Sequence, residues 1–431
     1  TLGGQNLIGV GTHLKFYISN VGNYNDVTPI RATVSLSNPF TTVSGSAVIT
    51  VLDSNGGYQD GDYVTFSNAS AVGGLTIDGE FVVSLSVTTA ANSYSITASS
   101  NATSSATGGG TVSAAYQINV GNPFAVPIEG WGASSWGSGA WNVGESSTTA
   151  IRFFSQSNFG EDLIFGNNGG SIFYWDATGS VTTRAVLLST LSGASDVPVV
   201  QNLILVSDIS RFVFCFGTNE IGSDTIDPTL LRWSDQEDAT NWTPSATNQA
   251  GSLRLSRGTK IVAASQARQE VLVWTDSSLY SLQYVGAPAV WAATLVGENI
   301  SISSQNAVAY ANGVAYWMGK DKFYMYDGRT QPLKCDVRKY IFNDFNTAQY
   351  SQVFSGTNES FHEVWWFYCS DGETNIDKYV IYNYLDKIWY YGTLARTAWL
   401  DSGLRDSPLA ATYTLNLVDH ESGVDDNQTT S

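Results

Sequence analysis

Short runs of apolar and aromatic residues recur along the chain, and the clearest pair lies within residues 313–335, at 314–318 and 323–326. The first run reads VAYWM and the second FYMY; GKDK separates them, and Asp327-Gly328 closes the second. Apolar runs of this length that are bounded by Gly, Lys and Asp are typical of strands joined by tight turns. The pattern therefore predicts a β-hairpin.

The second run of this hairpin recurs at intervals along the sequence. With Asp327 as the reference, related runs end at Asn20, Asp176, Ser234, Gln283, Asn383 and Asp419. From Asp176 onward the intervals are 58, 49, 44, 56 and 36 residues. Strand-rich repeats of about 40–50 residues are typical of propeller blades. We therefore predict an all-β protein, a β-propeller of six or seven blades, with its first strands in residues 1–30 and its remaining blades in 149–431.

Residues 31–118 interrupt this repeat. The interval from Asn20 to Asp176 is 156 residues, which is too long for one blade, and the interrupting stretch is dominated by Thr, Ser, Val, Ala and Gly. Its runs at 45–53, 61–68, 79–87 and 92–100 alternate apolar and polar residues, as strands with one buried face do. We predict an inserted β domain, a small sandwich or barrel.

Two further stretches depart from the strand pattern. Residues 119–148 form a Gly/Trp-rich connecting segment with Trp131, Trp136 and Trp141 at a spacing of five, which fits neither a helix nor one strand face. These indoles either cover the propeller or contact a neighbouring subunit or a ligand. Residues 336–346 alone have a helical period, and we predict a short surface helix with Val337, Tyr340, Ile341 and Phe345 on one face.

The aromatic residues of the repeating runs have two alternative roles. Exposed Trp and Tyr beside carboxylates would suit sugar binding. Their place inside the predicted strands favours packing of one blade on the next. The residues concerned are Trp175, Trp233, Trp274, Trp317, Tyr326 and Trp365.

The charge balance limits the partners. The chain has 20 Lys and Arg against 38 Asp and Glu, a net charge of −18. Proteins that grip DNA need the opposite sign, because contacts from Lys and Arg to phosphates supply most of the affinity. We therefore expect no tight DNA binding, although an acidic surface would let DNA slide past without adhering. No apolar run reaches the ~18 residues of a membrane helix, so we expect no membrane span.

Candidate catalytic and metal-binding residues are few. His13, His362 and His420 have no Ser or Cys partner at the spacing of a nucleophilic triad. His362 and His420 are each followed by Glu, but neither pair extends to the HExxH motif that binds zinc. Residues 53–62 superficially resemble a calcium loop, but Gly57 replaces a ligand and no Glu closes it, so we predict a turn. Asp425 and Asp426 are adjacent and would point apart.

The three cysteines, Cys215, Cys335 and Cys369, have no metal-ligand spacing, and we predict buried free thiols. Taken together, these residues lead us to assign no catalytic, cofactor-binding or metal site. We expect no enzymatic activity and no cofactor.

Three stretches, residues 149–176, 271–286 and 298–329, resemble the tail nozzle proteins of short-tailed bacteriophages, which belong with the tail tubular and packaged-DNA stabilisation proteins. Residues 38–81 look like the β domain embedded in such proteins, and 130–141 like the Gly-Trp segment that follows it. The resemblance covers nearly the whole chain. It identifies no residue that lines or closes a channel, so none is transferred.

The resemblance implies a structural virion protein of the phage tail. It implies a β-propeller that assembles as a homo-hexamer, the distal nozzle ring, below the portal and adaptor, retains packaged DNA and serves as a conduit for genome ejection. Double-stranded DNA would pass without sequence-specific binding, and whether tail fibres dock on this chain stays open. The alternative is a secreted or virion-associated β-propeller that binds or hydrolyses polysaccharide. A ring with a DNA-sized bore would favour the first, and a cleft with paired carboxylates the second.

Overall fold

Nearly all regular structure in the protein is β-strand. The computed structural model describes residues 7–20, 22–55, 57–86, 91–125, 150–208, 210–401, 405 and 407–422. In these residues the strands form sheets of three or four, and the helices are α1 (Arg338–Asn343) and short 3-10 turns at Leu188–Thr190, Thr347–Gln352 and Glu359–Phe361. The predicted all-β class is confirmed.

Five four-stranded sheets follow one another between residues 154 and 393, and in each the order across the sheet is the order along the chain. A three-stranded sheet follows them. The strands are β12 (Phe154–Phe159), β13 (Asp162–Asn167), β14 (Ile172–Trp175), β15 (Val186–Leu187); β16 (Gln201–Val206), β17 (Val213–Asn219), β18 (Ile226–Trp233), β19 (Gly251–Arg254); β20 (Ile261–Gln266), β21 (Val271–Thr275), β22 (Ser278–Gly286), β23 (Val290–Glu298); β24 (Val308–Ala311), β25 (Val314–Met318), β26 (Phe323–Tyr326), β27 (Thr330–Pro332); β28 (Phe354–Asn358), β29 (Glu363–Tyr368), β30 (Lys378–Asn383), β31 (Ile388–Thr393); and β32 (Ala398–Leu400), β33 (Leu409–Ala411), β34 (Leu417–Asp419).

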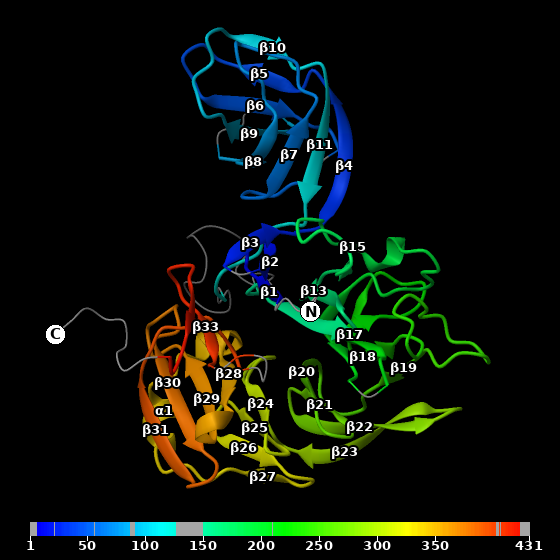
Figure 1. The fold of residues 1–431 in the computed structure, drawn as a ribbon, viewed down its shortest axis with the longest axis vertical. Coiled ribbons are helices and arrows are strands. Elements are labelled where there is room, and N and C mark those ends of the chain that lie inside the picture. The colour runs from blue at the N-terminus through cyan, green and yellow to red at the C-terminus, as the bar shows by residue number, and fades with distance from the viewer. Residues whose placement is uncertain are drawn as a thin grey trace, which may run out of the picture. The chain divides into compact units, whose positions relative to one another are not determined.

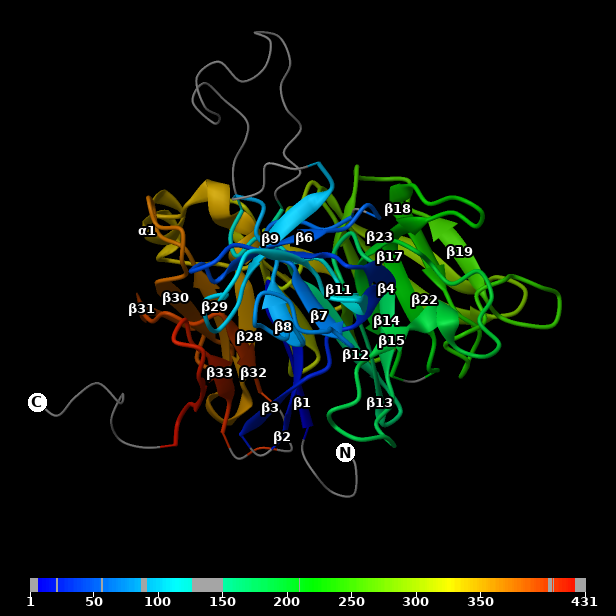
Figure 2. The ribbon, with the colours of Figure 1, turned by 90° about the horizontal axis from the view of Figure 1, so that it is seen from above.

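The first strands of these sheets are neighbours in space. β12 packs beside β16, β16 beside β20, and the series continues through β24 and β28 to β32. Figure 1 shows β20, β24 and β28 near a common centre with β23, β27 and β31 at the periphery, and β28 to β31 keep their order in Figure 2. Sheets that radiate in this way from their first strands are the blades of a β-propeller, as predicted.

The recurring run that ends at Asp327 and its equivalents corresponds to one strand of each sheet. From Asp176 onward, every such run overlaps the third strand of its sheet, β14, β18, β22, β26, β30 or β34. All of these strands except β34 carry buried apolar or aromatic residues, such as Trp175, Trp233 and Phe323. The predicted hairpin at 314–318 and 323–326 is β25 and β26 with the same bounds.

The chain consists of two compact units. The first comprises residues up to Gly121 with Glu161–Leu163 and Phe173–Leu187, and the second comprises Asn122–Gly160, Ile164–Ile172 and the residues from Leu188 onward. The first unit contains a three-stranded sheet of β1 (Leu7–Gly11), β2 (Phe16–Asn20) and β3 (Asn23–Asp26).

The first unit also contains two four-stranded sheets that share one core. One has the order β10 (Ala106–Gly108), β5 (Phe40–Thr42), β6 (Val48–Leu52), β9 (Ser93–Thr97); the other β4 (Ile30–Ser37), β11 (Thr111–Gln117), β7 (Tyr63–Ser67), β8 (Gly79–Val82). Phe40 and Phe66 meet between the sheets with ring centroids 5.1 Å apart, and both are buried. These strands form a small sandwich within residues 30–117; the proposed domain limits at 31 and 118 remain a prediction.

Ion pairs connect the sandwich to the preceding strands within the first unit. The buried Lys15 Nζ lies 2.9 Å from Asp26 Oδ2 and 2.5 Å from Glu80 Oε1, and Arg184 contacts both carboxylates at 3.3 and 3.8 Å. Burial acts against the charge of Lys15, but the hydrogen bonds to Glu80 and Asp26 raise its pKa. Lys15 is therefore a fixed positive charge between β3 and β8.

The predicted helix is present but shorter than expected. α1 covers six residues, with Ile341 buried. Tyr340, expected on the same face, is 51% exposed and rests on Tyr391 of β31 with ring centroids 4.6 Å apart. Tyr340 is thus more exposed than Ile341 of the same helix, because the outer strand β31 covers only part of its ring.

The blade aromatics are buried, as predicted. Trp175, Trp233, Trp274, Trp317, Trp365 and Tyr326 are each at most 8% exposed. Trp274 of β21 meets Trp317 of β25 at a centroid distance of 5.3 Å, and Trp365 of β29 stacks on Trp399 of β32 at 5.2 Å. These pairs join neighbouring sheets, so they hold one blade against the next.

Candidate functional site

A pocket of about 400 Å³, which we call the channel, lies among the first strands of the second unit. Apolar and polar side chains both line it, and none of the described lining residues is charged; the polar ones include Ser155, Gln156, Ser265, Asn306, Ser355 and Thr397. A volume of this size suits a small molecule.

Two of the channel serines have structural partners. Ser155 Oγ of β12 accepts a hydrogen bond from Ile204 N of β16 at 2.9 Å, and Ser157 Oγ accepts one from Val206 N at 3.1 Å. The hydroxyl groups thus satisfy backbone donors at the inner edge of the next sheet, which would otherwise be unpaired. Part of the polarity of the channel therefore serves the fold.

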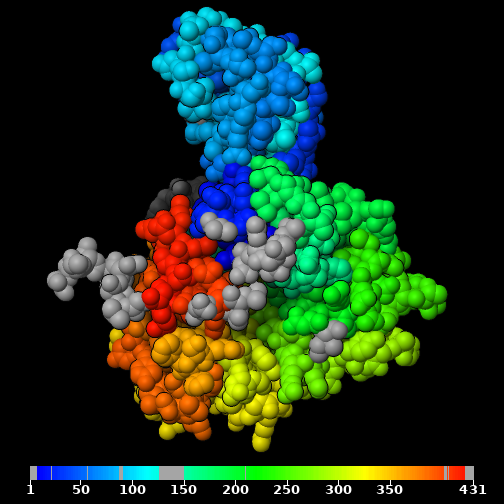
Figure 3. All heavy atoms as spheres, in the orientation of Figure 1, coloured from blue at the N-terminus to red at the C-terminus, as the bar shows by residue number. Residues whose placement is uncertain are grey.

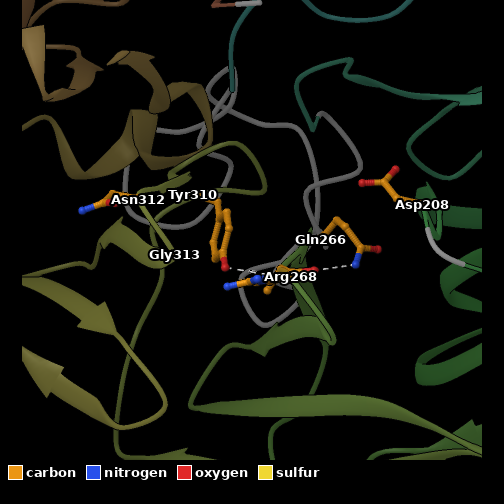
Figure 4. Close-up of a pocket in the computed structure, with 7 residues that line it drawn as sticks. Asp208, Gln266, Arg268, Tyr310, Asn312 and Gly313 are labelled. Carbon is orange, nitrogen blue, oxygen red and sulfur yellow. Dashed lines mark hydrogen bonds between the residues drawn. The ribbon is translucent and has the colours of Figure 1, made fainter. Parts of the chain in front are cut away.

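A second cavity, of about 500 Å³, lies at the turns that follow the first strands of three consecutive sheets. Figure 4 shows Arg268 and Tyr310 side by side, with Gln266 between them and Asp208. We call this cavity the turn pocket. It is lined by Asp208, Gln266, Ala267, Arg268, Tyr310, Asn312 and Gly313.

The turn pocket has hydrogen-bonding groups that the fold does not fully use. Arg268 N donates to Tyr310 Oη at 3.2 Å, which leaves the Tyr310 hydroxyl proton available to another acceptor. Gln266 Nε2 donates to Ala267 O at 2.6 Å, but Gln266 Oε1 is buried and accepts no hydrogen bond from the described residues. A buried acceptor without a donor is costly, so a ligand hydroxyl or N–H would be favoured there.

The charged side chains that line the turn pocket are Asp208 and Arg268. Asp208 is the one carboxylate among its lining residues. Glycoside hydrolysis ordinarily needs two carboxyl groups at a defined separation, one as acid and one as base or nucleophile. The lining residues could hold a neutral, hydroxyl-rich ligand, but they do not supply that pair.

The structure separates the histidines that the sequence offered. His362 has φ 58° and lies 3.4 Å through Nδ1 from Tyr384 Oη. His420 Nε2 accepts a hydrogen bond from Arg396 Nε at 2.9 Å, and its ring rests on Trp399 at 4.6 Å. Burial and the Arg396 guanidinium lower the pKa of His420 to about 4. His420 is therefore a neutral packing residue near pH 7.

The acidic run at residues 53–62 is structural, as the predicted turn requires. Asp53 is buried and accepts hydrogen bonds from Asn55 N at 2.8 Å and from Tyr116 Oη at 2.7 Å. Asp62 accepts from Gln59 N at 2.8 Å and from Val120 N at 3.0 Å. Both carboxylates are oriented by these bonds, Asp62 also pairs with Arg31 at 3.5 Å, and neither belongs to a group of described side chains that could hold a metal ion.

The cysteines are free thiols, but they are not equally buried. Cys215 and Cys369 are buried and Cys335 is half-buried. The prediction of burial is wrong for Cys335, because it lies in the connection between β27 and α1 and not in a strand. Trp131, Trp136, Trp141, Asp425 and Asp426 lie outside the described residues.

Metal clusters and membrane-spanning helices are both absent from the described part of the chain. No three His, Cys, Asp or Glu side chains are grouped there as a metal ion would require. No helix in the same residues has the length and apolar character needed to cross a membrane.

Comparison with known proteins gives remote structural similarities. No protein-family model matches the sequence, and no curated protein matches it either. Hsv2 of Kluyveromyces marxianus is similar with 8% identity and a TM-score of 0.36 over 64% of this chain and 74% of that one. Hsv2p of Kluyveromyces lactis has 12% identity and a TM-score of 0.34 over 62% and 73%.

A phage protein is also similar in structure. The endosialidase of phage phi92 shares 11% identity and a TM-score of 0.23 over 99% of this chain, which spans 64% of the endosialidase. TM-scores this low carry no argument about activity. The strand pairing described above is what establishes the fold.

The residues of the turn pocket were not predicted from the sequence. Asp208, Gln266 and Tyr310 are about 50 residues apart from one to the next, and no motif links them. The usable signal is their shared position, at or next to the first turn of a blade, which becomes visible only when the blade register is known.

Proposed function

We propose that the protein is a structural virion protein that forms the distal nozzle ring of a short phage tail, retains packaged DNA and guides it during ejection. The observation that carries the proposal is where the nozzle-like stretches fall. Residues 149–176 include β12 to β14, 271–286 include β21 and β22, and 298–329 include β24 to β26. The resemblance thus follows strands of three blades in a chain that also contains a β-sandwich.

The proposed nozzle needs a path for DNA. We place the bore of the proposed nozzle between copies of the chain and not inside one propeller. A ring of subunits with a charge of −18 each surrounds the duplex with like charge. DNA is then retained by a steric constriction and slides without adhesion.

Locating the protein in purified phage particles tests this proposal. Electron microscopy of the virion should show a six-fold ring of this propeller at the distal end of the tail, with a bore that admits a duplex. Absence of the protein from the virion, or a purified protein that releases sugars from a polysaccharide, would refute the proposal.

The turn pocket favours a second candidate function, the binding of polysaccharide. Its support is Gln266 Oε1, a buried acceptor that a sugar hydroxyl would satisfy. Titration calorimetry with host-surface polysaccharide should show binding that Asp208→Asn weakens, without release of reducing ends. Equal heats for the wild type and Asp208→Asn would exclude this pocket.

A further inference from the structure

Positive charge is concentrated on one surface of this acidic chain. Five basic residues lie in the β25–β26 turn, in the segment between β27 and α1, and in the first turn of α1, with Asp321 and Asp336 as the acids among them. They are Lys320, Lys322, Lys334, Arg338 and Lys339. All but Lys322 are exposed, and the Lys334 side chain is 92% exposed. We call these five basic residues, with Tyr340 and Tyr391, the basic surface.

An aromatic pair lies beside these charges. Tyr340 and Tyr391 are 51% and 49% exposed while their rings pack on each other. Tyr391 belongs to β31, the outermost strand of its sheet, and Figure 3 shows this orange part of the chain at the surface of the second unit. Exposed Tyr framed by charge is typical of the core and rim of a protein interface.

The turn between β17 and β18 has the opposite character. Ile221 is 46% exposed, and Glu220 and Asp224 lie on either side of it. Arg254 pairs with Glu220 at 2.6 Å and with Asp227 at 2.5 Å, so one positive charge stands against three carboxylates. We call Glu220, Ile221, Asp224 and Asp227 the acidic surface.

The two surfaces are suitably placed for a head-to-tail contact. The β17–β18 and β25–β26 turns occupy equivalent positions in their sheets, so both surfaces lie at the same end of the strands. Figures 1 and 2 show α1 and β19 on opposite sides of the second unit. A contact between two different surfaces of one protein adds copies in sequence and closes into a ring when the rotation allows.

We propose that the basic surface docks on the acidic surface of a second copy of this chain. The inference rests on the proposed nozzle, because it names the contact between neighbouring subunits of that ring. Opposite charges frame an apolar centre on both sides, so Tyr340 and Tyr391 would cover Ile221 while the charges pair at the rim.

A second copy fits this surface better than DNA does. The remainder of the chain is strongly acidic and repels a duplex, which is negative along its whole length, whereas a second copy can pair its acidic surface with this basic one. DNA also offers no aliphatic partner for the tyrosine pair at its phosphate backbone, whereas the acidic surface offers Ile221.

Charge reversal on the full chain tests the proposal. The variants are Lys334→Glu/Lys339→Glu on the basic surface and Glu220→Lys/Asp224→Lys on the acidic one. Native mass spectrometry and light scattering should show an oligomer for the wild type, and each reversal should raise the subunit dissociation constant at least about tenfold. A chain that carries all four substitutions should assemble again.

A matched control changes the same charge elsewhere. Arg329 and Lys387 are exposed and lie in the β26–β27 and β30–β31 turns, at the opposite end of the strands from the β25–β26 turn. Arg329→Glu/Lys387→Glu should therefore leave assembly unchanged. Circular dichroism melts identify any variant that fails to fold, and a misfolded pair is replaced by the single substitutions Lys339→Glu and Asp224→Lys.

Several outcomes would overturn the inference. Three concern assembly: the wild type is monomeric, the control variant dissociates as much as the charge reversals do, or the chain with all four substitutions stays monomeric. The fourth concerns DNA: the wild type binds double-stranded DNA, and Lys334→Glu/Lys339→Glu abolishes this binding without affecting assembly. If the protein is found in the phage tail but the charge reversals do not affect its assembly, the proposed contact is wrong and the nozzle proposal stands. If the charge reversals do disrupt assembly but the protein is absent from the tail, the nozzle proposal is wrong and the contact stands.

Discussion

Trp274 and Trp317 meet edge-to-face, with ring centroids 5.3 Å apart and an interplanar angle of 68°. They belong to the second strands of adjacent sheets, and both are fully buried. Trp317 also stacks on Tyr324 of its own sheet at 5.3 Å. The contact between blades is therefore continuous with the packing inside one blade.

Replacing Trp317 by Ala should lower the free energy of unfolding by about 3–5 kcal/mol, because a buried indole is exchanged for a cavity. Tyr326→Ala should fall in the same range, since Tyr326 is only 7% exposed. Urea unfolding measures both. Tyr390→Ala, at a residue that is 46% exposed, is the control and should cost less than about 0.5 kcal/mol. Unchanged stability in both core variants would contradict the role in packing.

Gly356 should not tolerate a side chain. A Cβ at this position of β28 would lie 2.2 Å from Trp399 Cδ1, and Trp399 is fixed by stacking on Trp365 and by its Nε1 bond to Thr357 O at 2.8 Å. Gly356→Ala should destabilise the protein by about 1–3 kcal/mol and alter tryptophan fluorescence. The matched change Gly179→Ala, whose Cβ would stay 3.6 Å from its nearest neighbour, should do neither.

Lys15→Met should destabilise the first unit by roughly 1–3 kcal/mol. The change leaves Asp26 and Glu80, which are 24% and 34% exposed, with Arg184 as the remaining cation of this cluster, and solvent reduces the cost below that of a fully buried pair. Calorimetry of the thermal transition measures the loss. Lys15→Met/Glu80→Gln should recover part of it, and a double variant less stable than the single one would argue against charge as the cause.

The stability of the wild type should fall between about pH 6.5 and about pH 4 because of His420. Its pKa is lowered to about 4 from 6.5 by burial and Arg396, so the unfolded chain binds a proton in this window while the folded protein does not. The contribution of neutral His420 to the free energy of unfolding is fully present above the pKa of the unfolded state, about 6.5. His420→Phe keeps a ring against Trp399 and should lose less stability between pH 7 and about pH 5. Parallel pH profiles for the two proteins would contradict this.

The sequence was sufficient where the structure is local. β25 and β26 have their predicted bounds because a tight turn fixes both strands. Most third strands were found because a polar residue lies at or just after their end, although β22 continues beyond Gln283 to Gly286. The exposure of Tyr340 could not be predicted, because its surroundings depend on β31, which is 48 residues later in the chain. The turn pocket was missed for the same reason: Asp208, Gln266 and Tyr310 meet only when blades pack side by side.

The core of the sandwich has a consequence for how this chain could change in evolution. Its buried apolar residues all lie between Leu36 and Tyr116, and the ties to β2 and β3 described above are polar. A different β domain could thus be substituted if it supplied a carboxylate in place of Glu80 to Lys15 and Arg184. The replacement domain would also need its two ends close together. This insertion site is therefore suited to the exchange of one accessory domain for another in evolution.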